Sequence, residues 1–174
     1  TVGQATPDMV QPTAMYAVAM LKSGQVEDGL HEARNMFSRI RDASAKQVAA
    51  APAIVREQIT ESLHLFGRVL MESAAVLSPK ASMTLLWSMV ENGGLESPLA
   101  EHAVANLGPM GISQLSPPDL TLALQVQARM LASNSALLFD VAHPIRFAHM
   151  LDVALSAALP LDAYTTRLVD QAVA

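Results

Sequence analysis

The chain has 174 residues, of which 51% are hydrophobic and 16% are charged, with a formal net charge of −5. A chain this apolar and weakly charged can bury one core, which excludes intrinsic disorder, and the lack of cysteine excludes disulfide frameworks, thiolate catalysis and cysteine-ligated zinc. The acidic balance argues against a broadly basic nucleic-acid-binding face, and no uninterrupted apolar run reaches the roughly 18 residues of a membrane span. The chain begins with Thr1, which we interpret as a processed protein or as part of a longer one.

Residues 1–12 contain glycine and prolines without helical periodicity, and we expect an irregular N-terminal arm there. Apolar residues at helical spacing predict a helical hairpin over 13–41, with a break at Ser23-Gly24. The Ala- and Ser-rich residues 42–52 are predicted to form either a frayed helix end or a linker. A long helix is predicted over 52–77, since proline is favoured in the first turn of a helix.

Three Ser-Pro pairs punctuate the second half of the chain at intervals of 19 residues: Ser78-Pro79, Ser97-Pro98 and Ser116-Pro117. A serine hydroxyl caps exposed N–H groups and proline suits the first turn, so helices are expected to begin near each pair. Two steps make a hairpin of 38 residues, which predicts hairpins over 78–115 and 116–153 and a closing helix over 160–173. The alternative is an ordinary bundle whose helices begin with Ser-Pro by chance.

Because no segment shows the β-branched alternation of strands, the predicted fold is all-α. We expect residues 13–174 to form a single domain of antiparallel helical hairpins stacked as a short α-solenoid. A shift of 38 residues aligns Leu86 with Leu124, and we expect these two residues and Trp87 to be buried between repeats. On that expectation, truncating Trp87 to alanine would cost about 3–5 kcal/mol.

Two segments resemble helices of organellar repeat proteins. The segment 78–90, which reads Ser-Pro-Lys-Ala-Ser-Met-Thr-Leu-Leu-Trp-Ser-Met-Val, resembles the first helix of octotricopeptide repeats and of the related heptatricopeptide repeats and FAST-kinase/RAP-type proteins. The second copy, from Ser116, keeps the Ser-Pro-x-x-Leu start but has Gln125 in place of Trp87. The segment Gly-Gln-Val-Glu-Asp-Gly-Leu over 24–30 resembles the second helix of a pentatricopeptide repeat, with Gly29 where alanine is usual.

These resemblances imply an α-helical repeat protein located in mitochondria or another organelle. The function they imply is a non-catalytic scaffold subunit of an organellar ribonucleoprotein, with the mitochondrial ribosome as the leading case, bound to protein subunits and contacting RNA only to a limited extent. The alternative is an accessory subunit of a large mitochondrial energy-converting complex with no RNA contact. The acidic charge of residues 81–174 favours that alternative.

No pattern of catalytic or ligand-binding residues stands out. None of the five histidines forms a His-Glu-x-x-His pair, and the sequence contains no Gly-x-Ser-x-Gly elbow and no phosphate-cradling glycine-rich loop. We therefore predict no catalytic residue, no metal site and no cofactor.

One cluster of cations in the N-terminal half has the chemistry for phosphate contacts: Arg34, Arg39, Arg41 and Lys46. Arg34 and Arg41 are seven residues apart and share one helix face. Four carboxylates lie nearby and favour the alternative that this segment is a solvated surface: Glu27, Asp28, Glu32 and Asp42. If RNA is bound, we expect it at this cluster rather than at residues 81–174.

Overall fold

The computed structural model describes residues 6–72, 77–93, 99–134 and 140–174, and no strand occurs within these ranges. The predicted all-α fold is confirmed. The elements are a 3₁₀ turn η1 (Pro7–Met9) and helices α1 (Val10–Lys22), α2 (Val26–Asp42), α3 (Ala45–Ala50), α4 (Ala53–Glu72), α5 (Pro79–Gly93), α6 (Ala100–Ala105), α7 (Pro109–Ser113), α8 (Pro117–Ser133), α9 (Ala142–Ser156) and α10 (Ala163–Val173).

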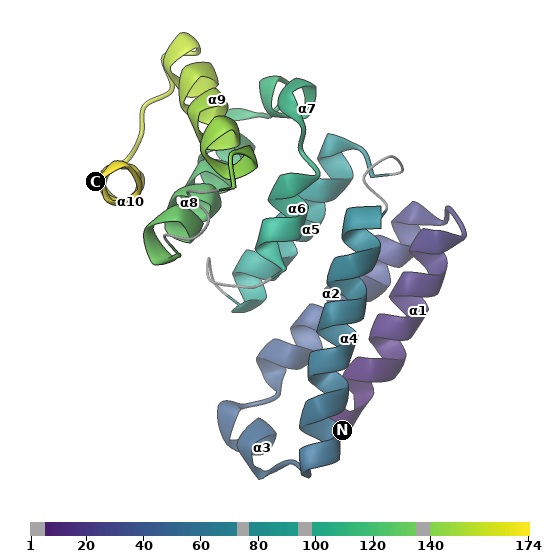
Figure 1. Ribbon diagram of the computed structural model, residues 1–174. Coiled ribbons are helices and arrows are strands. Elements are labelled where there is room, and N and C mark those ends of the chain that lie inside the picture. The colour runs from purple at the N-terminus through teal and green to yellow at the C-terminus, as the bar shows by residue number, and fades with distance from the viewer. Residues whose placement is uncertain (1–5, 73–76, 94–98, 135–139) are drawn as a thin grey trace.

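The helices follow one another in a stack that starts at the α1–α2 hairpin and ends at α10 (Figure 1). Helix α4 packs on α1 and α5 packs on α2, so the second layer covers the first hairpin. Helix α6 contacts α4, α5 and α8, and both α9 and α10 pack on α8. Because each layer packs mainly against its neighbours, the architecture is compatible with a short α-solenoid.

The first helix begins earlier than expected. Residues 1–5 lie outside the described ranges, but the prediction of an irregular arm through residue 12 is wrong from Pro7 onward, where η1 leads directly into α1. Pro7 opens η1, and Pro12 falls in the first turn of α1, where a backbone N–H has no intrahelical acceptor. Val10 is fully buried, so packing extends this end of the helix.

Helices α1 and α2 approach each other closely at Gly29. The chain turns between them at Gly24, which has a φ of +81°. A β-carbon placed on Gly29 would lie 2.8 Å from the Cγ and Cδ2 atoms of Leu21 and 3.1 Å from its backbone nitrogen. The close packing of the hairpin therefore accounts for glycine at a position where the pentatricopeptide pattern usually has alanine.

We expect Gly29→Ala to destabilise the protein although alanine is the better helix former. Overpacking costs about 1–3 kcal/mol, which outweighs a gain in helix propensity of at most about 1 kcal/mol. Urea denaturation of the variant measures the difference. His31→Ala is the matched control, because His31 is exposed on the same helix and its substitution tests propensity without a clash. A Gly29→Ala variant more stable than the native protein would contradict the close approach.

The segment between α2 and α4 is neither a frayed helix end nor a plain linker. It holds α3, which begins with a capping box. The Ser44 hydroxyl accepts the backbone N–H of Gln47 at 3.2 Å, and the Gln47 side-chain oxygen accepts the backbone N–H of Ser44 at 3.1 Å. These reciprocal bonds satisfy two N–H groups at a helix start and allow even this six-residue helix to form.

Two of the three Ser-Pro pairs begin helices in the described ranges. The hydroxyl of Ser78 accepts the backbone N–H of Ala81 at 3.2 Å before α5, and Ser116 caps α8 in the same way. Ser97 lies outside the described residues. The helix expected to fill the rest of the 78–115 hairpin is divided into α6 and α7 at Gly108-Pro109, because proline cannot donate the N–H that would continue the first of them.

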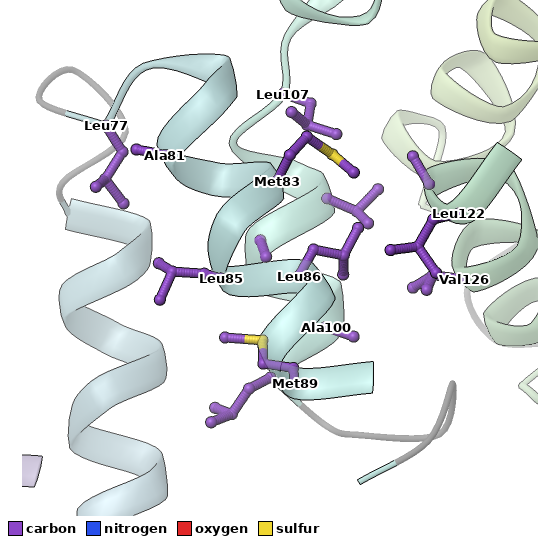
Figure 2. Close-up of a cluster of buried hydrophobic side chains, with 14 of the residues drawn as sticks. Leu77, Ala81, Met83, Leu85, Leu86, Met89, Ala100, Leu107, Leu122 and Val126 are labelled. Carbon is purple, nitrogen blue, oxygen red and sulfur yellow. The ribbon is translucent and has the colours of Figure 1, made fainter. Parts of the chain in front are cut away.

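Helix α5 lies at the centre of the core. Leu85 and Leu86 are both fully buried, and Figure 2 shows Leu86 directed toward Leu122 and Val126 of α8. Leu124 is also fully buried, so the structure places both leucines that the 38-residue shift aligns inside the core. The adjacent side chain, Trp87, is exposed at the surface instead.

Candidate functional site

A groove follows the line of contact between α2 and α5. It consists of two adjoining hollows of about 570 and 580 Å³, which share Arg34, Lys80 and Thr84 in their lining. The first hollow extends toward Arg41 and Trp87, and the second toward the beginning of both helices. We call this surface the α2–α5 groove.

Three cationic side chains line the α2–α5 groove. Arg34 and Arg41 come from α2, where a separation of seven residues places them about 10 Å apart along the helix axis. Lys80 comes from the first turn of α5. All three residues are exposed, and the pairing of Arg41 Nε with Asp42 Oδ1 at 2.9 Å is a solvated contact of small energy. These three cationic side chains are therefore accessible to an anionic ligand.

The other two cations of the predicted cluster are placed elsewhere. Arg39 is half-buried on α2 outside the groove lining, and Lys46 is exposed on α3. Sequence reasoning missed Lys80, whose place in the groove depends on the packing of α5 on α2. The sequence signal that could have located Lys80 was its position two residues after Ser78, which places it in the first turn of the helix that Ser78 caps.

Carboxylates limit the positive charge of the α2–α5 groove. Glu27 lines only the second hollow, whereas Glu91 and Asp119 line only the first. The three acids balance the three cations, but Arg34 and Lys80 line both hollows, so the central part of the groove is cationic. A short anionic segment would find attraction there and repulsion beyond either end.

Trp87 lies at the surface of the groove. Its relative exposure is 37%, so the predicted burial between repeats is wrong for this residue. Its indole N–H donates to Asp119 Oδ1 of α8 at 2.7 Å, while Asp119 Oδ2 accepts the hydroxyl proton of Ser116 at 2.7 Å. Trp87 thus contacts the next hairpin through its polar edge, because α8 offers a carboxylate there rather than an apolar side chain.

A second polar cluster joins α6, α8 and α9. Gln127 is fully buried, and its Nε2 lies 3.4 Å from Nδ1 of the buried His143. His143 Nε2 lies 3.4 Å from Glu101 Oε1, and Arg146 donates to Gln127 Oε1 at 3.3 Å. Burial lowers the pKa of Arg146, whereas the charges of Asp140 and Glu101 raise it. These bonds satisfy buried polar groups at a helix junction, a structural role.

Within the described ranges, no group of three or more histidine, aspartate or glutamate residues could hold a metal ion. None of the helices in those ranges is long and apolar enough to cross a bilayer.

Comparison with known proteins found no matching family model, no similar curated protein and no similar solved structure. The function is therefore inferred from the α2–α5 groove and from the resemblance of residues 24–30 and 78–90 to helices of repeat proteins.

Proposed function

We propose that this chain is a non-catalytic helical-repeat scaffold subunit of an organellar ribonucleoprotein that contacts RNA through the α2–α5 groove. The observation that carries the proposal is the meeting of Arg34, Arg41 and Lys80, from two successive layers of the stack, in one groove. The resemblance to octotricopeptide-type helices supports the organellar setting and favours a mitochondrial ribosome.

The geometry suits a few contacts to the RNA backbone. Arginine offers paired N–H donors to phosphate oxygens, and lysine adds a flexible point charge. Three cations balanced by three carboxylates would bind weakly, which fits a subunit that is held in its assembly mainly by protein contacts. Since phosphate contacts do not read bases, these cations alone would give little sequence preference.

A second candidate is an accessory subunit of a mitochondrial energy-converting complex with no RNA contact. It is favoured by three large apolar residues that are exposed at the N-cap of α9 and along this helix: Val141 at 69%, Ile145 at 66% and Leu155 at 79%. Such residues favour a protein neighbour. These exposed residues are compatible with both candidate functions, whereas RNA binding is expected only of the first.

The test is the binding of a labelled single-stranded RNA, followed by fluorescence anisotropy over a range of salt concentrations. Three phosphate contacts to single-stranded RNA predict a salt slope of about two in the logarithmic plot of affinity. The double variant Arg34→Glu/Arg41→Glu is expected to abolish binding, because it replaces attraction with repulsion at two of the three cations that line the groove.

The matched control is Arg68→Glu/Arg167→Glu, which changes the net charge equally at exposed positions on α4 and α10, outside the groove lining. It is expected to leave binding nearly intact. Equal losses in the two double variants would show that only net charge matters. No binding by the native protein at low salt would favour the second candidate.

A further inference from the structure

We propose that the Trp87 indole is a stacking platform for a nucleobase, so that the α2–α5 groove binds a nucleotide segment of single-stranded RNA and not phosphate alone. This inference rests on the proposed function and adds a second kind of contact to it. It starts from the exposure of the only tryptophan in the chain. Its neighbours Leu86 and Ser88 are buried, at 0% and 6% exposure.

The indole is held in place before any ligand arrives. The bond from its N–H to Asp119 Oδ1, at 2.7 Å, anchors its polar edge to α8. Asp119 is itself anchored, since it accepts the Ser116 hydroxyl proton at 2.7 Å and lies in the first turn of α8. A ring anchored in this way loses little conformational freedom when a planar ligand stacks on it. Asp119 is therefore a positioning residue for Trp87.

The same hollow offers groups for the rest of a nucleotide. Arg34, Arg41 and Lys80 line it together with Trp87, and its volume of about 570 Å³ is in the range of small-ligand sites. Single-stranded nucleic acids are commonly bound by cations that follow the backbone and an aromatic ring that stacks on a base. A phosphorylated peptide would use the cations but gain nothing comparable from the indole.

The experiment uses the intrinsic fluorescence of Trp87, which is free of other tryptophan signals. The probes are a ten-nucleotide oligoadenylate and an abasic oligomer with the same number of phosphates. Oligoadenylate is expected to quench the fluorescence and to bind about 5- to 150-fold more tightly than the abasic oligomer, the range that stacking of one base provides. Both oligomers are expected to compete for Arg34 and Arg41.

Substitutions at the platform should remove the preference for bases without removing phosphate binding. Trp87→Leu is expected to bind both oligomers with equal affinity, and Trp87→Phe to retain part of the difference. Asp119→Ala frees the indole but also removes a negative charge, which strengthens phosphate binding by both oligomers alike. The readout is therefore the ratio of the affinity for oligoadenylate to that for the abasic oligomer. That ratio is expected to fall in Asp119→Ala and to be largely kept in Asp119→Asn, whose amide oxygen can still accept the indole N–H.

Three results would overturn the inference. Equal affinity of the native protein for the two oligomers would show that Trp87 does not stack on a base, and the proposed binding to the RNA backbone would still stand. Equal quenching by the abasic oligomer or by a phosphoserine peptide would show that the indole senses phosphate and not a base. If neither oligomer binds, the proposed function fails together with the platform. The native titrations decide the matter even where Trp87→Leu does not fold.

Discussion

Truncation of Phe66 to alanine is expected to lower the free energy of unfolding by about 3–5 kcal/mol, the usual cost of removing a buried aromatic side chain. Phe66 is fully buried on α4 and meets Phe37 of α2 edge to face, with ring centroids 5.9 Å apart and planes at 83°. The substitution would remove apolar contacts and leave a cavity where the second layer covers the first hairpin. Urea denaturation measures the effect.

Ile54→Ala is the control on the same helix, because Ile54 is 63% exposed and its truncation should change stability by less than about 0.5 kcal/mol. A double-mutant cycle with Phe66→Leu and Phe37→Leu isolates the ring pair, which is expected to contribute about 0.5–1.5 kcal/mol beyond buried area. A loss below about 1 kcal/mol in Phe66→Ala would show that α4 does not pack on the first hairpin as described.

Leu86→Ala is expected to cost about 2–5 kcal/mol, since Leu86 is fully buried between α5 and α8. Figure 2 shows the side chain directed at Leu122 and Val126, so its loss weakens the contact between successive layers. Glu91→Ala, at an exposed position on α5, should change stability by less than about 0.5 kcal/mol. Similar melting temperatures for the two variants would mean that α5 presents a different face to the core.

Local signals predicted the helix starts best. The serine hydroxyl of a Ser-Pro pair bonds to an N–H three residues later, so the prediction at Ser78 and Ser116 required no knowledge of tertiary structure. The beginning of α1 could not be predicted in this way, because burial of Val10 rather than a capping signal extends that helix. Gly108-Pro109, which separates α6 from α7, is visible in the sequence, but the 19-residue spacing of the Ser-Pro pairs does not predict a break there.

The site was predictable only where one helix supplies it. Arg34 and Arg41 share a face of α2, so helical periodicity pairs them correctly. Arg39 is five residues from Arg34, which turns it away from that face. Lys80 joins the groove through the packing of α5 on α2, two helices that α3 and α4 separate in the chain. The exposure of Trp87 likewise depends on the carboxylate that α8 brings to it, which spacing within one repeat does not reveal.

The sequential packing of the layers has a consequence for folding. Because each layer packs mainly on the adjacent layers, most contacts join helices one to three places apart in the chain, which limits the loop-closure entropy lost before they form. Each layer can therefore add to the one already formed, and folding can spread along the stack from more than one starting point. Local opening can begin at either end of the stack, at the α1–α2 hairpin or at α10. The α2–α5 groove would then open with the first hairpin, so a ligand that bridges Arg34 and Lys80 would stabilise one end of the molecule.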